Sequence, residues 1–134
     1  MSDVVVDMSD KVTVNSATQS AVYSYQVQND RVLVLAEVSV FADTNFQTNG
    51  KITVVAGGRA VTSQNSQVAE VGINSNFTIA YPALQSHPKL WKVLQQGQTV
   101  EVRARITTGS GVLNIILVGV LMTMQEYETI LRGG

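Results

Sequence analysis

Two runs near the C-terminus constrain the fold more than any other feature of this chain. Thr99 to Thr107 alternates polar and apolar residues, and Val112 to Met122 is almost entirely apolar. Between them lies Gly109-Ser110-Gly111, a sequence typical of a tight turn. Because successive side chains of a strand point to opposite faces of a sheet, the alternation predicts a strand with one buried and one solvated face. We expect the two runs to form antiparallel strands.

The same pattern occurs earlier in the chain. Val22 to Gln28 alternates, with Tyr23, Tyr25 and Val27 on one face. After the turn residues Asn29-Asp30, the run from Arg31 to Phe41 is apolar on both faces as far as Ala36, which predicts a strand buried on both sides. About eight short strands with turn signals every ~8–12 residues predict an all-β fold, an antiparallel jelly roll or β-sandwich.

Three other segments complete the predicted organisation. The segment 42–50 is expected to be a loop, and Pro88 with the apolar residues that follow it predicts one short helix near residues 88–96. A chain of 134 residues is one domain. We expect residues 15–124 to form the jelly-roll domain, residues 1–14 an N-terminal arm or short strands, and residues 125–134 a C-terminal arm or short helix. Deleting residues 1–10 is expected to leave the fold intact but to weaken attachment to a partner.

The composition excludes several functions. Only 14% of the residues are charged, against a usual ~25%, so the polar surface consists of Ser, Thr, Asn and Gln, as in proteins that contact other proteins. The net charge of −1 and the absence of a basic block argue against binding nucleic acid. No apolar stretch approaches the ~20 residues of a membrane helix, and no signal peptide is recognisable, so we expect no membrane partner and synthesis in a cytoplasm.

Residues suited to catalysis or metal binding are scarce. The chain has no cysteine, and His87 is its one histidine, placed between Ser86 and Pro88 with no acid to orient it. The aspartates do not follow the spacing of a calcium-binding loop, and the glycine pairs at 57–58 and 109–111 predict hairpin turns rather than phosphate loops. We therefore predict no catalytic residue, no metal site and no cofactor. A sugar-stacking platform that includes Trp91 and Tyr81 is a weaker alternative.

A resemblance adds to this interpretation. A polar turn precedes the apolar strand at 28–40, Gly50-Lys51-Ile52-Thr53-Val54 follows, and the chain closes with 97–104 and 109–120. Over roughly residues 20–122, this spacing resembles the small jelly-roll domains of viral surface proteins, such as the capsid decoration or cement proteins, head fibres and receptor-binding knobs of phages.

The resemblance implies a structural virion protein rather than an enzyme. It would bind the major capsid protein on the virion surface and stabilise an icosahedral shell as a homo-oligomer, with a trimer as the expected state. The expected interface residues lie in the two arms: Val4, Val5, Val6, Met8, Tyr127, Ile130 and Leu131. The alternative is a carbohydrate- or receptor-binding knob of a fibre or spike, with a ligand at Tyr81, Trp91 or Phe46. A cupin-like enzyme is disfavoured, because cupin metal sites use several histidines.

Overall fold

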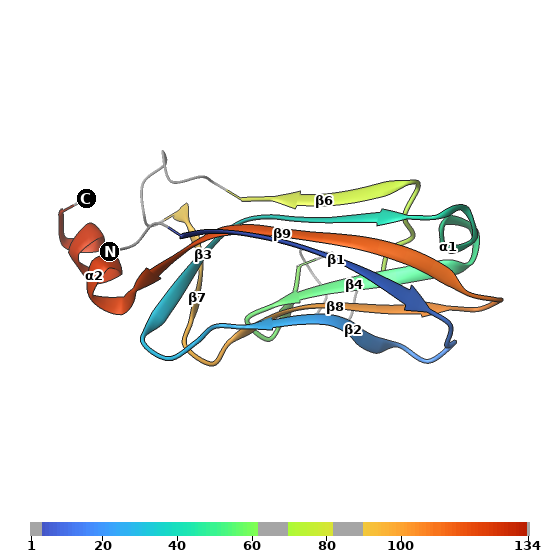
Figure 1. Ribbon diagram of the computed structural model, residues 1–134, viewed down its shortest axis with the longest axis horizontal. Helices are drawn as coiled ribbons and strands as arrows, with labels where there is room; N and C mark the ends of the chain where they lie inside the picture. The colour runs from blue at the N-terminus through green and yellow to red at the C-terminus, as the bar shows by residue number, and fades with distance from the viewer. Residues whose placement is uncertain (1–3, 62–69, 82–89, 134) are drawn as a thin grey trace.

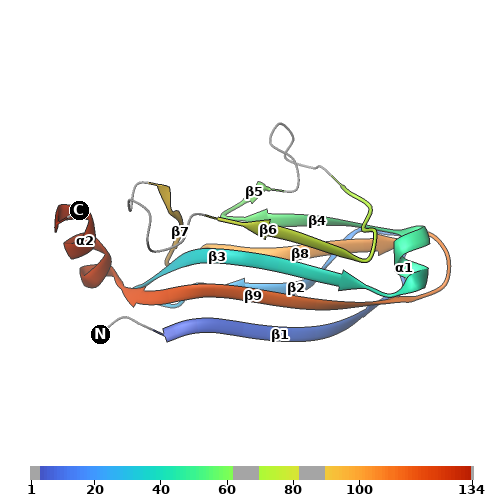
Figure 2. The same ribbon diagram turned by 90° about the horizontal axis from the view of Figure 1, so that it is seen from above.

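The computed structural model describes residues 4–61, 70–81 and 90–133, and for residues 4–10, 59 and 60 it describes the backbone alone. The elements are shown in Figure 1 and Figure 2. They are β1 (Val4–Val14), β2 (Ser20–Gln26), β3 (Arg31–Ala42), α1 (Thr44–Asn49), β4 (Gly50–Ala56), β5 (Arg59–Ala60), β6 (Asn76–Ala80), β7 (Lys92–Gln95), β8 (Thr99–Ile106), β9 (Gly111–Thr123) and α2 (Met124–Gly133).

The strands form two facing antiparallel sheets. The first sheet has the order β1-β9-β3-β6, with β7 also paired to β3, and the second has the order β2-β8-β4-β5. The pairs β1·β9, β2·β8, β3·β6 and β4·β5 are those of a long antiparallel ribbon folded over on itself. That connectivity is the jelly roll, so the predicted fold class is confirmed.

The core lies between the two sheets and follows the alternation in the sequence. In β8, Val100, Val102, Ala104 and Ile106 are at most 2% exposed, while the residues that alternate with them face outward. The run from Val32 to Leu35 is buried on both faces, as predicted. Leu33 and Leu35 belong to the main core between the sheets, whereas Val32 and Val34 belong to a second apolar cluster.

A helix closes one end of the sandwich, but it is α1 and not the predicted helix near residues 88–96. Segment 42–50, expected to be a loop, forms α1 because Asp43 caps it: its Oδ1 accepts from the backbone N–H of Phe46 at 3.0 Å. The other oxygen of Asp43 accepts from the backbone N–H of Val112 at 2.9 Å, which ties the helix to β9. An aspartate at the N-cap satisfies backbone donors that the helix leaves free.

The segment predicted as a helix near residues 88–96 contains strand β7 instead. Residues 88 and 89 lie outside the described part, and Lys92–Gln95 pairs with Val32–Leu35 of β3. A period of 3.6 and a period of 2 are hard to distinguish over so few residues. Strand pairing is favoured here because β6 pairs only with Glu37–Phe41 of β3. Lys92–Gln95 supplies hydrogen-bonding partners for the backbone of the rest of that edge.

The N-terminal segment is one continuous strand. β1 pairs with β9 from Val4↔Leu121 to Val14↔Gly111. The backbone of residues 4–10 is therefore part of the sheet. Removing residues 1–10 would leave β9 without this hydrogen-bonding partner from Ile115 to Leu121. The expectation that the fold survives this deletion intact no longer follows.

Candidate functional site

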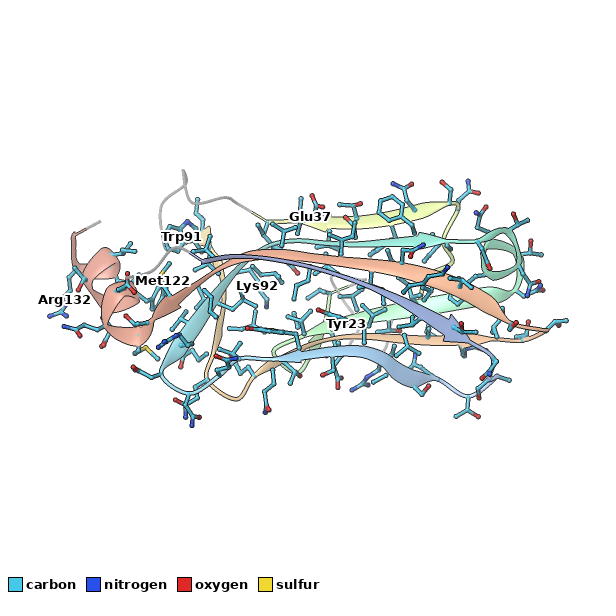
Figure 3. The ribbon with its side chains drawn as sticks, viewed as in Figure 1. Tyr23, Glu37, Trp91, Lys92, Met122 and Arg132 are labelled. Atoms are coloured by element: carbon cyan, nitrogen blue, oxygen red, sulfur yellow. The ribbon has the colours of Figure 1, made fainter. Side chains whose placement is uncertain are left out.

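The second apolar cluster lies on the outer face of the β1-β9-β3-β6 sheet, beneath α2. We call it the outer cluster. Its centre is buried, with Val32 at 0% and both Val34 and Met122 at 3% exposure. The half-buried residues packed around this centre are Trp91, Val93, Val120, Met124, Tyr127 and Ile130. Figure 3 shows Trp91 and Met122 at the end of the molecule that carries α2.

Helix α2 is fixed at its start by a reciprocal pair of capping bonds. The backbone N–H of Glu126 donates to Oγ1 of Thr123 at 3.1 Å, and the backbone N–H of Thr123 donates to Oε1 of Glu126 at 3.3 Å. This is a capping box, and its Thr-x-x-Glu pattern is visible in the sequence. That signal could have decided between an arm and a helix, but the prediction left both open.

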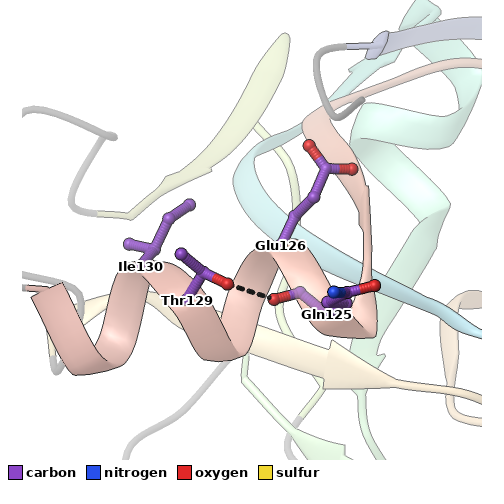
Figure 4. Close-up of a pocket in the computed structure, with 4 residues that line it drawn as sticks. All are labelled: Gln125, Glu126, Thr129 and Ile130. Carbon is purple, nitrogen blue, oxygen red and sulfur yellow. Dashed lines mark hydrogen bonds between the residues drawn. The ribbon is translucent and has the colours of Figure 1, made fainter.

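The predicted C-terminal interface residues have different surroundings. Tyr127 and Ile130 pack into the outer cluster of their own chain, while Leu131 is 40% exposed. Beside them is a shallow hollow of about 400 Å³ lined by Gln125, Glu126, Thr129 and Ile130 (Figure 4). The predicted N-terminal residues Val4, Val5, Val6 and Met8 lie in β1, at the edge of the sheet.

The three predicted ligand-binding residues do not form one platform. Phe46 is wrong as a ligand contact, because it is completely buried in the main core. Tyr81 packs against the same core, and burial raises the pKa of its hydroxyl. Trp91 belongs to the outer cluster. His87 lies outside the described residues.

An apolar strip on the outer face of the first sheet is the best candidate for a contact surface. Strand β9 buries Leu113, Ile115 and Leu117 completely in the core, yet the residues that alternate with them are also largely apolar. The strip consists of Ile116 and Val118 of β9, both half-buried, and Phe41 of β3, which is 41% exposed. The residues directly opposite them are polar, namely Asn114 beside Phe41, Ser39 beside Ile116 and Glu37 beside Val118. The strip is therefore a narrow apolar band on a mixed face, and it is the part of that face best suited to contact with another molecule.

The outer face of the other sheet is polar and bonded within itself. Arg105 Nε donates to both carboxylate oxygens of Glu70, at 3.1 and 2.8 Å, and Gln19 Nε2 donates to Glu70 and to Thr53 Oγ1. On the same face, Arg103 pairs with Glu101 at 3.0 Å. The hydrogen bond from Arg105 holds the pKa of Glu70 below its usual value. These groups join the segment at Glu70 to the sheet.

Replacing Glu70 with glutamine is expected to make the free energy of unfolding fall less steeply as the pH is lowered into the acid range. The pKa of Glu70 is lowered in the folded chain, so its contribution is fully present above the usual value of 4.5 and is lost as the pH falls below it. The effect is expected to be small, since both partners are partly exposed. Urea unfolding of both proteins between neutral pH and pH 3 measures it, and curves that stay parallel would contradict it.

Within the ranges 4–61, 70–81 and 90–133, no three His, Cys, Asp or Glu side chains gather as metal ligands would. None of the helices in the described part of the chain is long and apolar enough to span a bilayer.

No family model and no curated protein matches this chain. Some solved structures are loosely similar to it. A Bacillus endospore appendage that forms disulfide-linked pili has 14% identity and a TM-score of 0.46, with coverage of 90% of this chain and 89% of that one. The SPBc2 prophage-derived protein YomS has 13% identity and a TM-score of 0.44, with coverage of 86% and 95%. A chain in a solved structure of Desmodium yellow mottle tymovirus has 7% identity and a TM-score of 0.42, with coverage of 90% of this chain and 87% of that one. Likenesses this loose assign neither a family nor a function.

Proposed function

We propose that this chain is a structural virion protein, a capsid decoration or cement protein that binds the major capsid protein and stabilises an icosahedral shell from its surface. The observation that carries the proposal is the apolar strip of Phe41, Ile116 and Val118 on the outer face of the first sheet. A fold alone does not decide a function, whereas the chemistry of an exposed surface limits what that surface can bind.

The strip continues an apolar face that the chain covers only in part. Helix α2 and Trp91 cover one end of that face, where Val32, Val34 and Met122 are buried. Further along β9, Ile116 and Val118 stay half-buried, and Phe41 is the most exposed of the three phenylalanines that the structure describes. Covering this area would contribute about 25 cal/mol for each Å² of apolar surface removed from water. A decoration protein would act by this binding alone, tying neighbouring capsid subunits together.

The outer face of the second sheet supports the same choice of docking side. Its charged side chains are already paired within the chain, Arg105 with Glu70 and Arg103 with Glu101. Burying these pairs against a partner would cost desolvation free energy. The face with the strip also carries charge, because Glu37 and Asp7 lie directly opposite Val118 in the sheet, but its apolar residues offset part of that cost.

Phe41→Glu is expected to weaken binding to shells by tenfold or more, because it replaces the most exposed apolar side chain of the strip with a charge that the contact would bury. The probe is a shell assembled from the major capsid protein of the same genome, with binding measured by co-sedimentation. Ala21→Glu is the matched control: it adds the same charge at an exposed position opposite Arg103 on the other sheet, and should bind like the unmodified chain.

Three results would contradict the proposal. They are a genome that encodes no major capsid protein, a chain that does not bind such shells, and equal losses of binding in both variants. Binding to a glycan array that disappears in Trp91→Ala, with the fold retained, would favour the receptor-binding alternative.

A further inference from the structure

Strand β1 is an open edge of the first sheet. The strand order ends at β1, and among the described residues no strand pairs with its outer side. Figure 2 shows β1 along the margin of the molecule. The strand is 11 residues long and pairs with β9 in one unbroken register. An edge of this kind leaves alternate backbone N–H and C=O groups available to another strand.

The other described sheet edges carry the features that usually prevent such pairing. β5 has 2 residues, and β6 and β7, which share the far edge of the first sheet, have 5 and 4. β2 has a register shift between Ala21 and Tyr23. Short edge strands and bulges discourage the addition of a further strand. Strand β1 is the longest described edge and has no proline and no register shift. Its charged residues, Asp7, Asp10 and Lys11, disfavour strand addition unless the added strand supplies countercharges.

The sequence of β1 is complementary to itself in one antiparallel register. When two copies are paired about Ser9, Asp7 of each copy is directly opposite Lys11 of the other. The same register sets Val4 opposite Val14, Val5 opposite Thr13 and Val6 opposite Val12, and it leaves one mismatched pair, Met8 opposite Asp10. Cross-strand pairs of opposite charge and of β-branched residues stabilise a sheet.

The neighbouring registers are worse. In a continuous sheet, a residue and the residue directly opposite it point to the same face. The twofold axis must therefore pass through a residue of β1 and not between two residues, so the alternatives to Ser9 are registers centred on other residues. Centring on Asp7, Asp10 or Lys11 places that charge opposite itself. Centring on Met8 places Lys11 opposite Val5, where it has no countercharge. Ser9 is therefore the preferred centre.

We infer that two copies of this chain associate through their β1 strands about a twofold axis, which joins their first sheets into one continuous sheet. The occupant of the edge is a second copy, because facing itself about Ser9 is the one residue-centred register of β1 that sets opposite charges, Asp7 and Lys11, directly across from each other. A twofold contact of this kind is closed and self-complementary. This assigns a dimer where the resemblance implies a trimer.

If the chain binds a capsid shell as proposed, the dimer would bind it through two surfaces at once. In a continuous antiparallel sheet, corresponding faces of the two copies lie on the same side. Both apolar strips would then face the shell together, and two linked contacts bind more tightly than one.

Ser9→Cys is expected to form a disulfide-linked dimer on mild oxidation, detected by non-reducing electrophoresis. The chain has no other cysteine. Directly opposite residues of an antiparallel pair have Cα atoms ~4.5–5.5 Å apart, within the range a disulfide allows. Thr13→Cys is the control, because its counterpart would lie roughly 27 Å away at ~3.4 Å per residue. Failure of Ser9→Cys to cross-link, or equal cross-linking of both variants, would overturn the inference.

A charge reversal supplies an independent test in the absence of any shell. Lys11→Asp should weaken the dimer at least tenfold in sedimentation experiments, since Asp7 then faces an aspartate. Adding Asp7→Lys to the same chain should restore the dimer. Lys51→Asp, the same charge change on the opposite sheet, should have no effect. A sedimenting species of one or three chains, or a double variant that stays as weak as the single one with its fold intact, would overturn the inference.

Discussion

Phe46→Ala is expected to destabilise the folded chain by about 3–5 kcal/mol, the usual cost of removing a buried aromatic side chain. Phe46 is 0% exposed and attaches α1 to the end of the sandwich. Two glycines make room for it: a Cβ at Gly50 would lie 2.5 Å from its ring, and one at Gly111 would lie 2.7 Å from its Cβ. The space left by the ring could be filled only if β4 and β9 moved. The loss of stability should therefore lie toward the upper end of this range. Chemical denaturation with guanidinium measures it.

Phe41→Ala is the matched control for this prediction. It removes the same atoms from a side chain that is 41% exposed, and is expected to cost about 1 kcal/mol or less. If the two variants lost equal stability, α1 would not be anchored by Phe46. The pair also separates stability from function, because Phe41 belongs to the apolar strip.

Gly119→Ala is expected to destabilise the chain by about 1–3 kcal/mol through overpacking. A Cβ at this position would lie 2.7 Å from the backbone carbonyl oxygen of Val34 and 2.9 Å from Cδ1 of Leu33. Relief requires β3 to move at the register shift between Leu35 and Glu37, where β9 pairs with it. Thermal unfolding followed by circular dichroism measures the loss.

Gly72→Ala serves as its control. A Cβ added at Gly72 meets nothing within 4 Å among the described residues. The substitution is expected to be neutral or slightly stabilising, because alanine restricts the unfolded chain more than glycine does. A larger loss at Gly72 than at Gly119 would contradict the close approach of β3 and β9.

The sequence predicted the sheets well because burial imposes a period of two on long strands. The alternation of β8 and the two-sided burial at Val32–Leu35 both follow from that rule. Short elements were harder to predict. Over Lys92–Gln95 the apolar residues fit a helix or a strand equally, and only the position of β3 decides between them.

The contact surface was less predictable than the fold. Phe46 looked like an accessible loop residue because the N-cap at Asp43 was not recognised in the sequence. Tyr127 and Ile130 were expected to contact a partner, but they cover Val32 and Val34 of their own sheet. Which apolar residues stay uncovered depends on where α2 packs, and that is a tertiary property.

The most direct test of the account is cryo-electron microscopy of shells assembled with this chain. We predict ordered jelly-roll density on the shell surface, with the outer face of the β1-β9-β3-β6 sheet, including Phe41 and Ile116, against the capsid subunits. Shells that carry no such density, or a chain that contacts the capsid through Glu70 and Arg105 on the opposite sheet, would contradict it.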